Sequence, residues 1–70
     1  MTEVRAPMVG KVIEVMVVSG ATVAAEDELL IIESMKMEIP VPAPAAGTVE
    51  AVHVTAGDTV QENDLLLTMT

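Results

Sequence analysis

Apolar residues occur along the chain in short runs of strand length, separated by segments that contain glycine, proline or aspartate. No segment keeps the apolar spacing of three and four residues that marks an amphipathic helix. The β-branched residues Val, Ile and Thr, which favour strands, number 12, 4 and 7 in the sequence. The pattern predicts an all-β protein, with strands at Lys11–Val17, Leu29–Ile32, Thr48–Val54 and Leu65–Met69.

The sequence also contains an internal repeat. When residues 4–32 are aligned with residues 41–69 without a gap, 13 of the 29 positions are identical. The identical pairs are Val4/Val41, Ala6/Ala43, Pro7/Pro44, Gly10/Gly47, Val12/Val49, Val15/Val52, Val17/Val54, Gly20/Gly57, Thr22/Thr59, Val23/Val60, Asp27/Asp64, Leu29/Leu66 and Leu30/Leu67. Neither half can cover its own apolar face, so the two should pack about a pseudo-twofold axis as a flattened β-barrel or sandwich. In both halves the valines break strict alternation, which predicts a bulge near Val12–Val15 and near Val49–Val52.

Composition and charge exclude several function classes. The sequence has 11 acidic and 3 basic residues, a net charge of −8, so we expect no nucleic-acid partner. It has no aromatic residue to stack on bases, and no cysteine for disulfides, thiolate chemistry or metal binding. A small secreted domain more often has disulfides, so we expect a cytoplasmic protein, or a matrix protein that lacks its targeting segment. No apolar run approaches the ~20 residues of a membrane span, and we expect no membrane partner.

Residues 33–40, Glu-Ser-Met-Lys-Met-Glu-Ile-Pro, have no counterpart in the second half. A hairpin centred between Met35 and Lys36 makes Ser34 face Met37, Glu33 face Glu38 and Ile32 face Ile39. Facing glutamates are destabilising, and Met-Lys is not a favoured two-residue turn. Local rules broken in this way tend to mark functional sites. From the residues alone, the methionines are either core residues beside a solvated lysine or an exposed recognition surface.

The segment Glu33–Glu38 resembles the attachment motif of the biotinyl/lipoyl domain family, of the biotin carboxyl carrier type. That motif commonly reads Ala-Met-Lys-Met, and Ser34 stands in the alanine position. Ala6–Gly10, Gly47–Val49 and Ala56–Val60 also resemble family segments, so that the similarity covers essentially the whole chain.

The resemblance implies one biotinyl domain over residues 1–70, with repeat halves 4–32 and 41–69 flanking the attachment hairpin 33–40. It implies two four-stranded sheets in a barrel-sandwich hybrid, with the hairpin at the end opposite both termini. A biotin protein ligase would join biotin to Lys36 through an amide, with Met35 and Met37 aiding recognition. The tethered biotin would carry CO₂ between the biotin carboxylase and carboxyltransferase sites of a biotin-dependent carboxylase, such as an acyl-CoA carboxylase. Because Glu33 and Glu38 favour the charged ammonium, activation must come from the ligase, and the domain is a carrier and not an enzyme.

The chain departs from the family pattern at two turns. Family members often have glycine where this chain has Glu26 and Asn63. Glutamate accepts positive φ less readily than asparagine does, so the turn at Glu26 is expected to be built differently. The repeat leaves no room for the protruding thumb of some acetyl-CoA carboxylase carriers, and no Ala/Pro-rich linker precedes it. We therefore expect a small separate subunit or an excised domain, with residues 1–3 loose.

Other candidate residues point to no second chemistry. Lys11 starts a strand and has no methionine neighbours, and the lone His53 is expected on a strand surface. The acidic run Glu26–Glu28 lacks the spacing of a calcium loop, and no metal site is expected. The sequence has neither a phosphate-binding glycine loop nor a Ser-His-Asp set, so no catalytic residue is assigned.

Two alternatives to a biotin carrier remain. One is a lipoyl carrier of a dehydrogenase or glycine cleavage complex, since lipoyl domains share the fold but usually have an acidic or small residue beside the lysine. The other is an acidic interaction module that is never modified.

Overall fold

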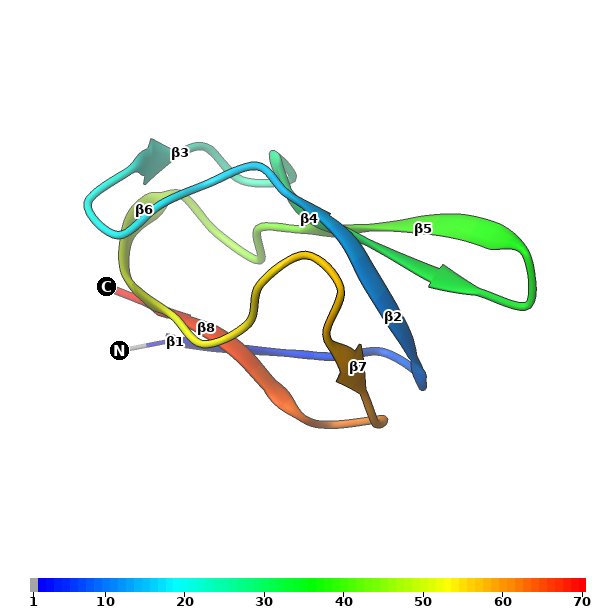
Figure 1. Ribbon diagram of the computed structural model, residues 1–70. Helices are drawn as coiled ribbons and strands as arrows, with labels where there is room; N and C mark the ends of the chain where they lie inside the picture. Colours follow the sequence, from blue (N-terminus) through cyan, green and yellow to red (C-terminus); the bar gives the residue numbers. More distant parts are fainter. Residues whose placement is uncertain (1) are drawn as a thin grey trace.

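The computed structural model describes residues 2–70 and contains eight strands in two sheets (Figure 1). The strands are β1 (Thr2–Arg5), β2 (Gly10–Val15), β3 (Thr22–Val23), β4 (Glu28–Ser34), β5 (Met37–Pro42), β6 (Gly47–Val52), β7 (Thr59–Val60) and β8 (Leu65–Met69). One four-stranded sheet has the order β1-β8-β6-β3 and the other the order β5-β4-β2-β7, with antiparallel pairing throughout. The all-β prediction and the two four-stranded sheets are confirmed. Residues 2–70 include no helix long and apolar enough to cross a membrane.

The sequence repeat relates one sheet to the other. A shift of 37 residues takes β1, β2, β3 and β4 onto β5, β6, β7 and β8, so the strand order of one sheet becomes that of the other. Hydrogen bonds in the connections follow the same relation. The Gly20 N–H donates to Val49 O at 2.8 Å, and the Gly57 N–H donates to Val12 O at 2.6 Å. Each sheet therefore takes two strands from each half of the chain.

The core is aliphatic and is supplied equally by both halves. Its buried members are Val4, Ala6, Val12, Val23, Leu29, Leu30, Ile32, Val41, Ala43, Val49, Val60, Leu66, Leu67 and Met69. The two Leu-Leu pairs, Leu29–Leu30 and Leu66–Leu67, are fully buried at equivalent places in β4 and β8. Burying each such side chain stabilises the fold by about 1.5–3 kcal/mol, so these strands fix both halves in place.

The irregularities predicted in the two long strands are present. The register shifts between Val12 and Glu14 in the pairing of β2 with β4, and between Val49 and Ala51 in the pairing of β6 with β8. These bulges bend both strands at points that the repeat relates by 37 residues.

The expectation of a different turn at Glu26 is wrong. Glu26 has φ 71° and Asn63 has φ 74°, so both residues are left-handed. The Glu26 N–H donates to Ala43 O and the Asn63 N–H donates to Ala6 O, both at 2.8 Å. The same bond to the opposite half thus holds both turns in one shape, although glutamate has no local preference for it.

Two further differences from the sequence expectations lie at strand edges. Thr2 and Glu3, expected to be loose, pair with Met69 and Thr68 of β8, while residue 1 lies outside the described residues. The two-residue strands β3 and β7 were not expected, because two residues give no readable period. Both form through pairing with the opposite half, with β6 and β2 respectively.

Candidate functional site

The hairpin of β4 and β5 has the register predicted from the sequence. The facing pairs are Ser34–Met37, Glu33–Glu38 and Ile32–Ile39. Ile32 is fully buried and Ile39 is half-buried, so the base of the hairpin belongs to the core. Beyond that base two more facing pairs lead to the turn, whose two central residues are Met35 and Lys36.

The turn requires an uncommon backbone at both central positions. Met35 has φ 54° and Lys36 has φ 65°. Positive φ at both positions is the signature of the type I′ turn, which matches the twist of the flanking strands and normally uses Asn-Gly. A side chain in the left-handed region costs about 1–2 kcal/mol, so the pair is held there by the pairing behind it. The sequence rules disfavoured Met-Lys here, and the structure keeps the hairpin by accepting that strain.

The side chains at the turn project into solvent. Met35 is 91% exposed and Met37 is 63% exposed, and Lys36 is also exposed. Within residues 2–70, the Lys36 ammonium makes no ion pair or side-chain hydrogen bond. A long, mobile amine at the apex of a two-residue turn is accessible to an enzyme from outside the domain.

The turn lies at one end of an elongated molecule. The principal extents are 30 × 18 × 17 Å. The start of β1 pairs with the end of β8, and both lie at the opposite end from the hairpin, as Figure 1 shows. Neither end of the described chain therefore covers the hairpin.

The other basic and imidazole candidates lie elsewhere. Lys11 is exposed on β2, opposite Glu33 in register, within a regular part of the sheet. His53 is exposed just after β6, and its backbone N–H donates to Leu66 O at 2.9 Å. Neither residue is at a turn apex, and in the described part of the chain neither side chain makes an ion pair or a side-chain hydrogen bond.

The acidic run at residues 26–28 has a structural role. The Ala24 N–H donates to Asp27 Oδ2 at 2.9 Å, and at the equivalent turn the Gln61 N–H donates to Asp64 Oδ2 at 2.8 Å. Among residues 2–70 no group of three His, Cys, Asp or Glu side chains is arranged to hold a metal ion. Asp27 therefore closes a turn.

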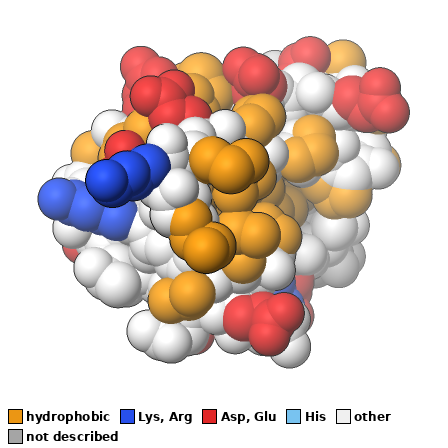
Figure 2. Space-filling view, turned by 90° about the vertical axis from the view of Figure 1, so that its right-hand side faces the viewer, with side chains coloured by type: hydrophobic (Ala, Val, Ile, Leu, Met, Phe, Trp, Pro, Cys, Tyr) orange, Lys and Arg blue, Asp and Glu red, His pale blue; other side chains and the backbone are white. Residues whose placement is uncertain are grey.

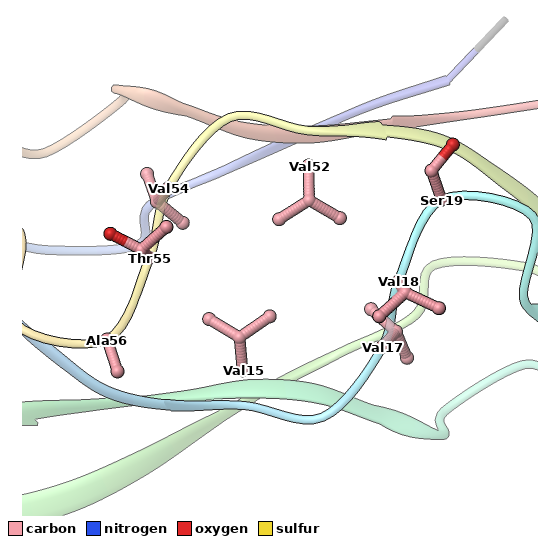
Figure 3. Close-up of a pocket in the computed structure, with 8 residues that line it drawn as sticks. All are labelled: Val15, Val17, Val18, Ser19, Val52, Val54, Thr55 and Ala56. Carbon is pink, nitrogen blue, oxygen red and sulfur yellow. The ribbon is translucent and has the colours of Figure 1, made fainter.

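The structure also contains a valine-lined groove that the sequence analysis did not anticipate. Its volume is about 440 Å³, and its lining residues are Val15, Val17, Val18, Ser19, Val52, Val54, Thr55 and Ala56. These residues come in pairs related by the repeat, and Figure 3 shows Val15 and Val52 pointing toward each other across the groove. The groove is thus lined equally by the two halves of the chain, and the turn at Lys36 is not part of it. The repeated valines were the available signal, but their exposure depends on the packing of the two halves.

The chain is similar to a known protein family over almost its whole length. Residues 2–69 match the family described as "Biotin-requiring enzyme" (Biotin_lipoyl). The chain belongs to the Biotin_lipoyl family. A "Biotinylated protein TB7.3 homolog" of Mycobacterium leprae is 48% identical over 64 residues, which are 91% of this chain and 90% of that protein. Human mitochondrial pyruvate carboxylase is 48% identical over 65 residues, 93% of this chain but only 6% of the carboxylase.

Solved structures agree with this membership of the Biotin_lipoyl family. A single-chain, multi-domain long-chain acyl-CoA carboxylase matches with a TM-score of 0.93 and 38% identity, over 99% of this chain and 7% of that chain. The lipoyl domain of the 2-oxoglutarate dehydrogenase complex from Azotobacter vinelandii matches with a TM-score of 0.85 and 26% identity, over 100% and 96%. The fold predicted for a biotinyl or lipoyl domain is therefore confirmed, and the carboxylases among these relatives agree with the expected role of a carboxyl carrier.

The hairpin suits the covalent attachment at Lys36 that the sequence resemblance predicts. An amide needs a primary amine that an enzyme can reach, and the exposed Lys36 at the turn provides one. The Lys36 side chain is exposed and does not line the valine-lined groove. The residues present therefore suit a tethered group that leaves the domain surface, and not a group bound inside it.

Proposed function

We propose that this chain is a biotin carboxyl carrier in which Lys36 holds biotin through an amide. The observation that supports this most strongly is the exposed Lys36 at the apex of a two-residue turn, between Met35 and Met37. In this proposal residues 1–70 form one biotinyl domain, with repeat halves 4–32 and 41–69 flanking the attachment hairpin 33–40. The carrier acts in the cytoplasm, as the lack of cysteine favours.

The work of the chain is to present one nucleophile. A biotin protein ligase supplies biotin whose carboxyl group is bonded to an activating group. The Lys36 ammonium first loses a proton, and the neutral Nζ attacks the activated carbonyl carbon. The C–N bond forms as the bond to the activating group breaks; that group leaves with the bonding electrons, and Nζ gives up a second proton. The amide is uncharged, so the modified hairpin loses its apical positive charge while Glu33 and Glu38 keep their negative ones. The domain contributes position and access, and the ligase contributes activation.

Tethering explains why such a carrier is useful. The attached biotin supplies a ring that is carboxylated at one active site and gives up CO₂ at another. The β4–β5 hairpin keeps Lys36 at the end of the molecule, so the arm can visit both the biotin carboxylase and the carboxyltransferase. A tether of this kind maintains a local concentration of about millimolar without a new binding step. The partner enzymes, and not this domain, select the molecule that accepts the CO₂.

The decisive experiment compares two lysine variants. Lys36→Arg keeps the positive charge but removes the amine that can be acylated, so we expect no biotin on the variant after co-expression with a biotin protein ligase. Lys11→Arg, the matched control on β2, is expected to remain fully modified. Intact-mass spectrometry and a streptavidin blot provide the readout, and peptide mapping identifies the modified residue. A streptavidin signal from the Lys36→Arg protein would refute the assignment.

A lipoyl carrier is the second candidate, because the Azotobacter vinelandii lipoyl domain has the same fold over 96% of its length. The methionines on both sides of Lys36 favour biotin, since the lipoyl pattern usually has an acidic or small neighbour. Expression with both cofactors and both attachment enzymes distinguishes the two, because the adducts differ in mass. A lipoyl adduct, or no adduct, would overturn the proposal; the latter would favour an unmodified interaction module.

A further inference from the structure

The loop between β1 and β2 lies beside the attachment hairpin. In the antiparallel register Lys11 faces Glu33, so the chain runs from Lys11 back through Gly10 and Val9 toward the level of the turn. Gly10 packs closely on β4: a Cβ there would lie 2.7 Å from Glu33 O and would overlap the Ile32 side chain. This close approach brings the connection between β1 and β2, which contains Met8 and Val9, toward the end of the molecule where the hairpin lies (Figure 1).

The repeat supplies an internal comparison for this loop. Its counterpart joins β5 to β6, where Ala43, Pro44 and Gly47 repeat Ala6, Pro7 and Gly10. Both loops are anchored in the same way: the Ala6 N–H donates to Asp64 O at 2.9 Å, and the Ala43 N–H donates to Asp27 O at 2.8 Å. Yet Met8 and Val9 correspond to Ala45 and Ala46. The loop geometry therefore does not require large apolar side chains at these two positions.

The Met8 and Val9 side chains, which the loop geometry does not require, are also exposed to solvent. Met8 is 38% exposed and Val9 is 51% exposed. With Met35 and Met37 they make four of the six exposed large hydrophobic residues of the described chain; the other two are Met16 and Val18. We call Met8, Val9, Met35 and Met37 the apical patch. Figure 2 views this end of the molecule and shows hydrophobic side chains gathered in its middle. Acidic side chains lie along the top and at the bottom, and Lys or Arg side chains lie at the left.

We propose that the whole apical patch, and not the hairpin alone, is the docking surface for the biotin protein ligase. This inference rests on the proposed function of Lys36. Acylation brings the reacting atoms of the ligase to Nζ itself, so the ligase must approach the turn and cover its apolar surroundings. Carboxylase sites act instead on the far end of the biotinyl arm, where such close approach to the loop is not required.

Charge defines the partner surface further. The exposed Glu33 and Glu38 face each other directly behind the turn, and the chain has a net charge of −8. A ligase surface with an apolar depression bordered by basic side chains complements this arrangement. Opposite charge at the rim raises the association rate, and apolar contact at the centre supplies the affinity.

The test uses a loop that the molecule already contains. The double variant M8A/V9A gives residues 6–10 the sequence Ala-Pro-Ala-Ala-Gly that residues 43–47 have, so folding is expected to be retained. We expect kcat/KM of the ligase for the unmodified domain to fall about tenfold, mainly through a higher KM, because apolar burial is lost on docking. The matched control is M16A/V18A, which removes a 40% exposed methionine and a 72% exposed valine remote from the turn, and we expect no change.

The outcomes separate this inference from the proposed function. If the wild-type domain is biotinylated at Lys36 and M8A/V9A is modified with the same kcat/KM, the docking proposal is wrong while the carrier function stands. An equal loss in M16A/V18A would also overturn it, as would a loss of carboxylase turnover in M8A/V9A with unchanged biotinylation. Thermal melting of both variants, compared with the wild type, excludes unfolding as the cause.

Discussion

At the scale of single residues, the attachment turn combines an unfavourable backbone conformation with an exposed apolar side chain. Met35 and Lys36 both adopt positive φ, which an Asn-Gly pair would accept with little strain. Met35 is also the most exposed of the large hydrophobic side chains. A residue that neither packs against the domain nor suits its own backbone is best explained by contact with another molecule. The strain at Met35 thus supports the recognition role proposed for it.

This interpretation predicts opposite effects of one substitution on stability and on modification. Asparagine tolerates the left-handed region, so Met35→Asn should stabilise the domain by about 0.5–1 kcal/mol and raise the Tm by several degrees. The same change should slow biotinylation, because the apical patch loses an apolar side chain. Met37→Asn is the control: Met37 lies in β5 without positive φ, so modification should slow with no gain in Tm. A Tm for Met35→Asn at or below that of the wild type would contradict the strain argument.

At the scale of elements, the repeat determines local structure even where the residue type disfavours it. Glu26 takes the same left-handed conformation as Asn63 because both N–H groups donate across to the opposite half of the chain. A tertiary hydrogen bond here overrides the local preference of glutamate. The two turns therefore have the same backbone conformation, which suits Asn63 in one turn and is unfavourable for Glu26 in the other.

Exchanging these two residues tests that pairing. Glu26→Asn should raise the free energy of unfolding by about 0.5–1 kcal/mol, because asparagine is better tolerated at positive φ. Asn63→Glu should lower it by a similar amount. The double exchange should leave it nearly unchanged if the two sites act independently. Urea denaturation of the three variants gives the measurement. Single variants that shift the midpoint in the same direction would show that the turns are not equivalent.

The same comparison shows what the sequence alone could predict. The long strands and the hairpin register followed from the apolar pattern and the repeat. The role proposed for Lys36 rests on a resemblance around Met35–Met37 and stays a prediction. The short strands β3 and β7 could not be predicted, because they exist only through pairing with the opposite half. Met8 and Val9 were not recognised as neighbours of the turn, since their position depends on how closely Gly10 approaches β4.

At the scale of the whole molecule, the two halves are interlocked and not stacked as separate units. Of the six strand pairings, only β2–β4 and β6–β8 stay within one half; β1–β8, β2–β7, β3–β6 and β4–β5 join the halves. The core takes equivalent leucines from both halves at its centre. A half on its own keeps one strand pair and loses the apolar surface that covers it. An isolated pair of strands is at best marginally stable in water.

Separate peptides of residues 1–36 and 37–70 should therefore both be unfolded. Each should give a disordered far-UV circular dichroism spectrum and narrow amide proton dispersion, since its leucine pair has nothing to pack against. Mixing the two at equal, high concentration should restore β structure, because the four pairings between the halves and the common core form only in the complex. Equimolar mixtures with a 1–36 peptide carrying Leu29→Ala should recover much less, because that change removes a fully buried side chain at a cost of about 2–5 kcal/mol. Native-like dispersion from either peptide alone would contradict the interlocked arrangement and would mean that one half contains a sufficient core of its own.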